Sequence, residues 1–309
     1  MGVARVGKRR VPTFGLAPLV VGMFEFQVDR LTPEYVRDFH QYLDEGFRQA
    51  VVGARTAQLR TVPVRAEIAT ARRVAPYDDI RSYLASHPGP FSVINCVCRQ
   101  AAGILGHECT TSSTHETCLM IGSVAPHGRE IDHEELLSIL DRAEREGHVL
   151  QPQNSREPSF ICCCCRDCCE VLANARKLPR PADATPSAYQ ARVNAELCSA
   201  CRKCVKRCPM EAISMSTPGG GASAATAKKP GTRTDAGSVS AAWVNLDRCI
   251  GCGLCATTCP DSAIALVPRE ERQRIPVNNT GMYLRMYRER RGILGVLGIA
   301  ARRLLRLRI

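Results

Sequence analysis

The first strong pattern of apolar and polar positions lies between residues 32 and 47. Apolar side chains recur there every three or four positions, as on the buried face of an amphipathic helix. Thr32 and Pro33 precede the pattern and favour a helix start, because threonine caps free N–H groups and proline fits the first turn. We expect a helix whose core side chains are Tyr35, Val36, Phe39, Tyr42, Leu43 and Phe47.

A second helix is predicted between Asp132 and Gly147. Asp132 caps it, Glu135 completes a capping-box-like start, and Gly147 ends it. The apolar positions between these ends fall on one face, and the charged positions form a solvated face. The predicted buried stripe consists of Leu136, Leu137, Leu140 and Ala143.

Shorter apolar stretches predict strands, bounded by proline- and glycine-rich turns. The expected strands are residues 16–26, which are rich in Val, Leu and Phe, residues 59–66, which alternate, and residues 92–96 and 243–246. Residues 76–84 predict a short helix, and the His-Pro-Gly-Pro sequence at 87–90 marks a domain boundary. Residues 1–90 are therefore expected to form an α/β region.

Three other segments lack a strand or core-helix pattern. Residues 177–186 are rich in Pro and Ala and predict a linker, and residues 216–240 predict a disordered insertion of Gly, Ala, Ser, Thr and Lys. Residues 268–309 form a basic tail, with a helix in which Gly292 and nearby glycines weaken the pattern. Its apolar face would consist of Ile293, Val296, Leu297, Ala300, Leu304 and Leu307.

Two cysteine runs dominate the second half of the chain. Cys198 to Pro209 and Cys249 to Pro260 both follow C-x2-C-x2-C-x3-C-P. The flanking Val-Asn and Ala-Ile pairs repeat with the same offset of 51 positions that separates Cys198 from Cys249. The chain therefore contains an internal duplication of one loop-and-helix unit. Structural zinc is disfavoured, because zinc knuckles lack the third cysteine and the closing Cys-Pro.

Residues 188–267 resemble the bacterial two-cluster ferredoxin domain, in which the fourth cysteine of each run binds the other cluster. The resemblance implies two [4Fe-4S] clusters. Their ligand sets would be Cys198, Cys201, Cys204 and Cys259 for the first cluster, and Cys249, Cys252, Cys255 and Cys208 for the second.

A separate cysteine-rich segment, residues 91–180, precedes this domain. It predicts one or two additional iron–sulfur centres, either apart from each other or with shared ligands; buried thiols without metal are the alternative. His107 and His115 lie close by and are further candidates, as ligands or as hydrogen-bond partners. One subset with favourable spacing is Cys162, Cys165 and Cys168, and another pairs Cys164 with Cys168 or Cys169. The full candidate set is Cys96, Cys98, Cys109, Cys118, Cys162, Cys164, Cys165, Cys168 and Cys169.

Residues 15–267 also resemble a little-characterised group of prokaryotic 4Fe-4S dicluster-domain proteins. The resemblance rests on Val21-Gly-Met-Phe-Glu25, Cys96-Val-Cys98-Arg99, His115-Glu-Thr-Cys118 and the cysteines from 162 to 169. That group usually has Asn at the position of Cys163, which implies that Cys163 is not a required ligand. The expected fold class is α+β, with an α/β N-terminal part, the cysteine-rich segment, the ferredoxin-type domain and the basic helical tail.

Composition and charge limit the remaining possibilities. The 18 cysteines occur in clumps, which favours metal binding over disulfides. No export cleavage site is evident, which favours a cytoplasmic location. The net charge is +12, but the tail from Tyr283 carries eight Arg and one Glu. A general nucleic-acid role is therefore not expected. The tail is a candidate for peripheral membrane contact, and the alternatives are a helix that docks on a partner and a solvated tail. No dinucleotide or P-loop fingerprint is present.

Together these patterns predict an iron–sulfur electron-transfer protein. The alternatives are a redox enzyme or enzyme subunit whose catalytic centre is upstream, and a redox sensor that responds through its upstream thiols. The first cysteine loop contains Arg202, Lys203, Lys206 and Arg207, so we expect a redox partner with an acidic docking face. Positive charge favours the reduced cluster, so the first cluster should have the higher potential.

Overall fold

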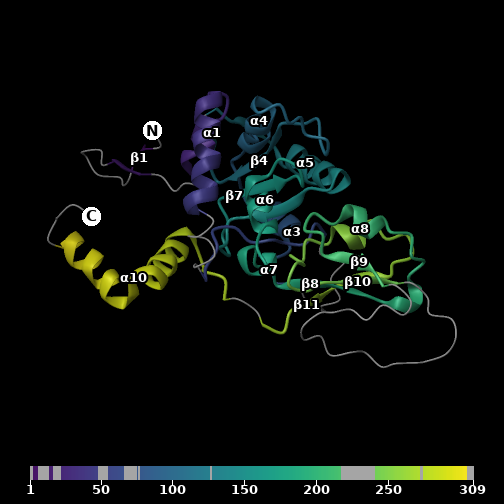
Figure 1. Cartoon of the computed structure of the whole chain (residues 1–309). Helices are drawn as coiled ribbons and strands as arrows, with labels where there is room; N and C mark the ends of the chain where they lie inside the picture. The colour runs from purple at the N-terminus through teal and green to yellow at the C-terminus, as the bar shows by residue number, and fades with distance from the viewer. Residues whose placement is uncertain are drawn as a thin grey trace.

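The computed structural model describes residues 3–5, 14–16, 22–47, 55–65, 75, 77–125, 127–216, 241–271 and 274–304. Figure 1 shows a central body of strands and helices, a ferredoxin-like lobe beside it, and helix α10 (Asn279–Leu304) projecting from it. The predicted insertion lies outside the described residues from position 217 to 240.

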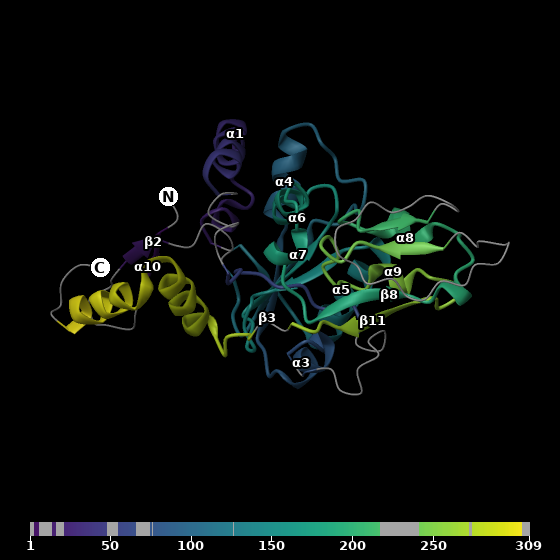
Figure 2. The same ribbon diagram turned by 60° about the horizontal axis from the view of Figure 1, so that its bottom comes forward.

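The central body is built on an antiparallel sheet with strand order β5-β3-β4-β7-β6. Its core side holds Leu119, Ile161 and Val93, which pack with α3 (Ile80–Ser86) and α5 (His133–Glu146). Figure 2 shows α6 (Glu170–Arg176) on the other side of the sheet from α3. The strands are β3 (Phe91–Asn95), β4 (Glu116–Ile121), β5 (Arg129–Ile131), β6 (Val149–Pro152) and β7 (Phe160–Cys164).

The predicted helix at residues 132–147 is confirmed as α5. The Asp132 side chain accepts a hydrogen bond from the Glu135 N–H at 2.8 Å, and Gly147 ends the helix in the left-handed conformation. Its buried side chains are Leu136, Ile139, Leu140, Ala143 and Glu144.

Helix α1 (Pro33–Tyr42) confirms the first predicted helix, with Thr32 as its cap, and continues into the π-helical turn Leu43–Phe47. It packs against α4 (Val97–Ile104) in a small core of its own. Tyr42, expected in the core, is exposed instead. That core consists of Phe24, Val36, Phe39, Leu43, Val97 and Ala101.

Other expectations about elements are wrong in part. Residues 22–26, expected in a strand, lie in helical turns, the last of which is Glu25–Gln27. Residues 17–21 lie outside the described part. Residues 59–65, expected in a strand, make only isolated bridges from Leu59 and Val62. Two of their backbone N–H groups donate elsewhere instead, from Thr61 to the Pro186 carbonyl and from Val64 to the Cys252 carbonyl. The expected linker contains α7 (Pro181–Ala184) with a buried proline. A strand pair, β1 (Val3–Arg5) and β2 (Phe14–Leu16), lies near the chain start.

The ferredoxin-like lobe consists of two interleaved halves. Strand β8 (Tyr189–Val193) of the first repeat pairs with β11 (Ile264–Pro268) of the second, and β9 (Ile213–Met215) pairs with β10 (Ala242–Val244). Each repeat therefore supplies one strand to each small sheet. The remaining elements are the turn Ala195–Leu197 and the short helices α8 (Lys203–Arg207) and α9 (Leu254–Thr257).

The lobe and the central body share one apolar core, which includes Leu140 of α5, Leu172 of α6 and Leu266 of β11. Backbone hydrogen bonds cross between them, as from the Val64 N–H to the Cys252 carbonyl at 3.0 Å. The cysteine-rich segment is therefore held directly against the ferredoxin-like lobe.

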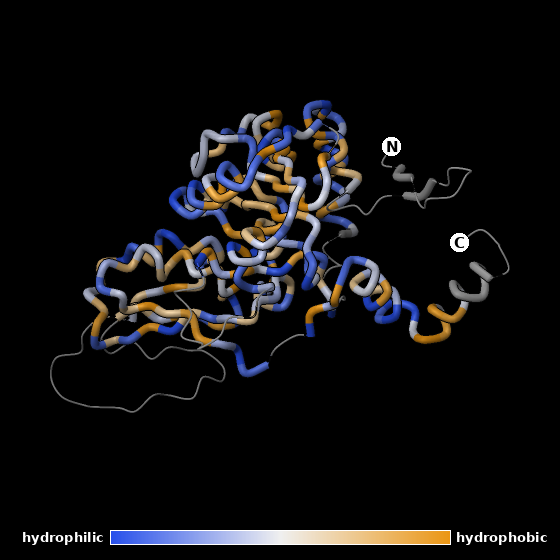
Figure 3. Tube along the Cα trace, turned by 180° about the vertical axis from the view of Figure 1, so that it is seen from behind, coloured by the Kyte–Doolittle hydropathy of each residue, from blue (hydrophilic) through white to orange (hydrophobic). Residues whose placement is uncertain are grey.

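Helix α10 changes direction at Gly292, whose φ of 68° is not helical. Before this point the helix is anchored, because Glu289 accepts hydrogen bonds from the Thr56 N–H and hydroxyl at 2.9 and 2.7 Å. After it, Ile293, Leu294 and Leu297 are exposed, and Figure 3 shows this hydrophobic stretch away from the body. No helix in the described ranges is long and apolar enough to span a membrane.

Candidate metal centres

The structure brings the eight ferredoxin cysteines together in two pockets. The first, of about 310 Å³, is lined by Cys198, Cys201, Cys204 and Cys259. The second, of about 340 Å³, is lined by Cys208, Cys249, Cys252 and Cys255. Each pocket therefore combines three cysteines of one run with the last cysteine of the other.

Left-handed backbone conformations bend both cysteine loops in the same way. Ala200 and Arg202 have φ of 56° and 61°, and the equivalent Gly251 and Gly253 have φ of 66° and 82°. Glycine is required at position 251 for a further reason, because a Cβ there would collide with the Tyr189 carbonyl oxygen. The second loop thus lies directly against strand β8.

Backbone N–H groups donate to four of the cysteine sulfurs that line the two pockets, in a symmetric pattern. Within each run, the Ala212 N–H donates to Cys208 at 3.2 Å and the Ala263 N–H to Cys259 at 3.3 Å. Between the repeats, the Ala191 N–H donates to Cys249 at 3.4 Å and the Ala242 N–H to Cys198 at 3.5 Å. Hydrogen bonds to sulfur stabilise thiolates and help to set a cluster's potential.

The two pockets differ in exposure and charge. Cys201 is exposed in the first pocket, whereas all four cysteines of the second are buried. Lys203 and Lys206 are exposed beside the first loop, but Arg207 turns inward and donates to the Glu144 and Arg145 carbonyls at the end of α5. Burial raises the pKa of the Cys252 thiol to about 12, so metal binding there must release protons.

Six upstream thiols form a second group, between the sheet and the starts of α4 and α6. Cys118 and Cys162 are paired across β4 and β7, while Cys96 and Cys169 immediately precede the two helices. Neighbouring thiols interact with one another in the order Cys118, Cys162, Cys164, Cys169, Cys98 and Cys96, and we call these six residues the six-thiol network. Hydrogen bonds from Cys118 and Cys164 lower the pKa of Cys162 to about 5.

Most cysteines of the network lie inside regular secondary structure. Cys98 lies inside helix α4 and Cys118 inside strand β4. Alternation along β7 puts Cys162 and Cys164 on one face of the sheet and Cys163 on the other, the face that also carries Ile161. The predicted subset of Cys162 with Cys165 and Cys168 is therefore divided between two groups.

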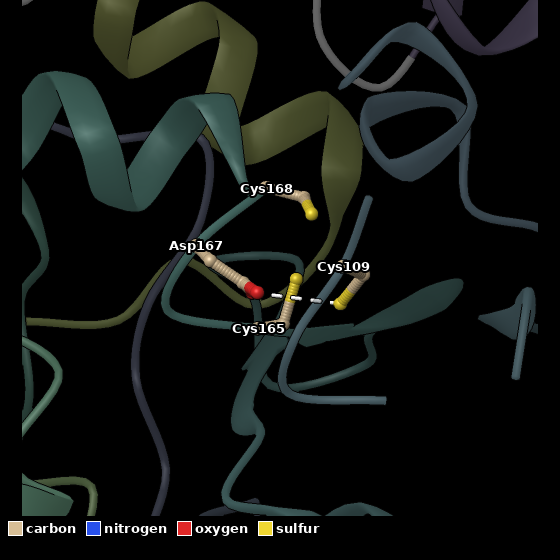
Figure 4. Close-up of side chains that lie close together, drawn as sticks. All are labelled: Cys109, Cys165, Asp167 and Cys168. Carbon is tan, nitrogen blue, oxygen red and sulfur yellow. Dashed lines mark hydrogen bonds between the residues drawn. The ribbon is translucent and has the colours of Figure 1, made fainter. Parts of the chain in front are cut away.

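The other group contains Cys109, Cys165 and Cys168, together with Asp167. Their ligating atoms all lie within 4.8 Å of one another and converge on one point (Figure 4). The Asp167 carboxylate accepts a hydrogen bond from the Cys109 thiol at 3.5 Å. We call these residues the compact quartet. In the described part of the chain, neither His107 nor His115 joins such a group.

Three residues near these groups were not predicted as site residues. Glu25 lies close enough to Cys96 and Cys162 to interact electrostatically, and burial raises its pKa to about 8. Arg99 is buried beside Cys165, and Asp167 belongs to the compact quartet. In the sequence, Glu25 and Arg99 occur within the motifs that resemble the group of prokaryotic 4Fe-4S dicluster-domain proteins, but nothing there indicated a role for either side chain.

Comparison with known families agrees with the ferredoxin-like lobe. Residues 197–264 match the model of the 4Fe-4S dicluster domain, which supports iron–sulfur clusters in this part of the chain. A search of curated proteins found no match. The dicluster domain and the many cysteines together indicate iron–sulfur electron transfer.

The close contact at Gly251 can be tested by substitution. Gly251→Ala should prevent the second pocket from closing, because its Cβ meets the Tyr189 carbonyl, and should remove about four iron atoms per chain. The matched control is Ala200→Gly at the equivalent position, which should keep its iron. Iron analysis of anaerobically purified protein measures both, and full iron in Gly251→Ala would contradict the role of this contact.

Proposed function

We propose that the protein transfers electrons through two [4Fe-4S] clusters in the dicluster domain and at least one further centre in the cysteine-rich segment. The observation that carries this proposal is the exchange of the fourth cysteine between the two pockets. Cys198, Cys201, Cys204 and Cys259 would hold the first cluster, and Cys249, Cys252, Cys255 and Cys208 the second.

The two clusters would lie close enough for electron exchange. Cys204 and Cys208 bracket one turn of α8, and each faces a different pocket. The backbone N–H of Cys208 donates to the Cys204 carbonyl at 3.1 Å, so the two ligands are joined by one short stretch of chain. A single helical turn would therefore connect the clusters.

The six-thiol network is the proposed site of the further iron–sulfur centre. Its sulfurs are half-buried or buried, and hydrogen bonds from Cys164, Cys98 and backbone N–H groups keep the pKa of Cys169 well below its usual value. Thiolates are the form that binds iron. Six sulfurs exceed the four ligands of a simple cubane, which leaves room for a larger or open centre.

A redox enzyme is the second candidate, and the position of Glu25 favours it. Its carboxyl group accepts a hydrogen bond from the Gly22 N–H at 2.7 Å and lies beside the network cysteines Cys96 and Cys162. A carboxyl group at an open metal centre could deliver a proton to a reduced substrate. A small molecule that changes the spectrum of the upstream centre would support this candidate, and electron transfer without any such effect would support the first.

Substitution of the network should separate the upstream centre from the ferredoxin clusters. The double variant Cys98→Ser with Cys169→Ser should lose upstream iron and retain about eight iron atoms per chain. Cys163→Ser is the control, because Cys163 lies outside the network, and it should keep the wild-type iron content. Iron, acid-labile sulfide and EPR after dithionite reduction measure the result. Equal iron in all three proteins would refute an upstream cluster.

The first cluster should have the higher reduction potential for two reasons. Water reaches Cys201, and Lys203 and Lys206 add positive charge, so both effects favour the more negative reduced cluster. Replacing both lysines by Gln should lower that potential by roughly a few tens of millivolts. Lys177→Gln is the control, because Lys177 pairs with Asp44 away from this loop. A redox titration monitored by EPR measures the potential. If the double variant shows the same potential as the wild type, these charges do not make the first cluster's potential the higher one.

The same exposed loop is the proposed docking surface for an acidic redox partner. Arg202, Lys203 and Lys206 are exposed around Cys201, where an electron can leave the protein over a short distance. Because these charges lie in water, association should weaken as salt concentration rises.

We also propose that the end of α10 contacts anionic membrane surfaces. Ile293, Leu294 and Leu297 are 68%, 83% and 58% exposed, and arginines flank them in the sequence. The full chain should sediment with vesicles that contain anionic lipid, and Leu294→Asp should reduce the bound fraction several-fold. Val124→Asp, at another exposed apolar position, is the control. Equal binding by Leu294→Asp and wild type would exclude this contact.

A further inference from the structure

The compact quartet differs in size from the two ferredoxin pockets. Its four ligating atoms lie within 4.8 Å of one another, and among the described residues the ferredoxin cysteines do not form such a tight group. The cysteines at the corners of a four-iron cube must stand further apart, because the iron atoms already separate them. The quartet is therefore too tight for a cubane.

A single tetrahedral metal ion fits this spacing. With metal–sulfur bonds of about 2.3 Å, two thiolates on one zinc ion lie about 3.8 Å apart, and a thiolate and a carboxylate oxygen slightly closer. The distance from Cys109 Sγ to Asp167 Oδ1 is 3.5 Å. The side chains come from two segments, and they enclose one point in Figure 4.

Asp167 is oriented by the loop that carries Cys109. Its Oδ2 atom accepts hydrogen bonds from the Thr110 N–H at 2.6 Å and the Thr111 N–H at 3.2 Å, while Oδ1 lies toward the Cys109 sulfur. Carboxylates that bind metals are commonly held by such outer hydrogen bonds.

Arg99 supplies independent evidence for negative charge at this point. It is only 2% exposed and lies close enough to Cys165, Cys109 and the network cysteine Cys96 to interact electrostatically, and its Nε and Nη1 atoms have no hydrogen-bond partner among the described residues. Its neighbour His148, with 3.5 Å between Arg99 Nη2 and His148 Nε2, brings no negative charge. A buried guanidinium stays charged and requires an anion, which neutral thiols do not provide. Three thiolates, one carboxylate and a divalent ion would carry a net charge of about −2.

We infer that Cys109, Cys165, Cys168 and Asp167 bind one zinc ion, separate from the centre of the six-thiol network. Binding would convert three thiols to thiolates and release their protons, while Asp167 is already ionised. Zinc is favoured because it accepts both sulfur and carboxylate ligands in tetrahedral sites and binds more tightly than ferrous iron. Arg99 would balance the charge of the site.

The zinc ion would have a structural role at the contact with the ferredoxin-like lobe. Arg166 lies between the proposed ligands Cys165 and Asp167, donates to the Lys206 carbonyl at 3.2 Å, and pairs with Glu211 at 3.2 Å. Fixing the residues around Arg166 would fix its contact with α8. This structural role of the zinc ion rests on the proposed electron-transfer function, but it does not depend on the number of iron–sulfur clusters.

Zinc and iron should be measured separately on full-length protein purified without added metal. We expect about one zinc ion per chain in the wild type, and its loss in Cys109→Ser with unchanged iron. Cys163→Ser, which lies outside the quartet, should retain the zinc. If the wild type contains no zinc, or if Cys109→Ser loses iron or keeps its zinc, the inference is wrong.

Cobalt gives a second readout, and its measurement on the wild type does not depend on how a variant folds. Growth with Co²⁺ should give wild-type protein with the visible bands of tetrahedral cobalt–thiolate bonds, and Asp167→Asn should shift them. Absence of cobalt–thiolate bands would also overturn the site. If the wild-type protein contains zinc but no iron, the proposed electron transfer is contradicted, whereas the zinc site is still supported.

Discussion

The ferredoxin-like lobe depends on one constraint: neither cysteine run can complete a pocket alone. Cys259 closes the first pocket and Cys208 the second, so each repeat needs the other. The strand pairs β8–β11 and β9–β10 follow the same exchange, and so do the hydrogen bonds from Ala191 and Ala242 to the sulfur atoms of the other repeat. Cysteine position and strand pairing therefore specify the same arrangement. A long segment between β9 and β10 is compatible with it because loop closure costs little additional entropy.

The sequence predicted elements well where local chemistry decides their ends. Asp132 and Gly147 bound α5, and Thr32 starts α1, because caps and left-handed glycine act within a few residues. Prediction failed where a distant partner decides. Residues 59–65 alternate like a strand, yet strand formation also needs a continuous neighbour, and the segment meets β6 only at isolated bridges.

The grouping of the upstream cysteines shows the same limit. Spacing alone favoured Cys162 with Cys165 and Cys168, whereas the end of β7 at Cys164 changes the chain direction and separates them. Asp167 and Arg99 carried no signal of their own, since single charged residues usually face solvent. Only the fold shows that Arg99 is buried among thiols. The resemblance to the two-cluster domain implied the exchange of the fourth cysteine, and the two pockets of the structure group the cysteines in the same way.

The proposed centres differ in burial. Three of the six network cysteines and all four cysteines of the second pocket are buried, whereas the first pocket opens at Cys201. Arg166 and Arg207 connect the central body to α8, whose ends carry Cys204 and Cys208. Exposure and the charges of Lys203 and Lys206 would give the outermost cluster the highest potential of the ferredoxin pair. In the proposed function, electrons that enter from the upstream centre would therefore move downhill towards the surface where an acidic partner can dock.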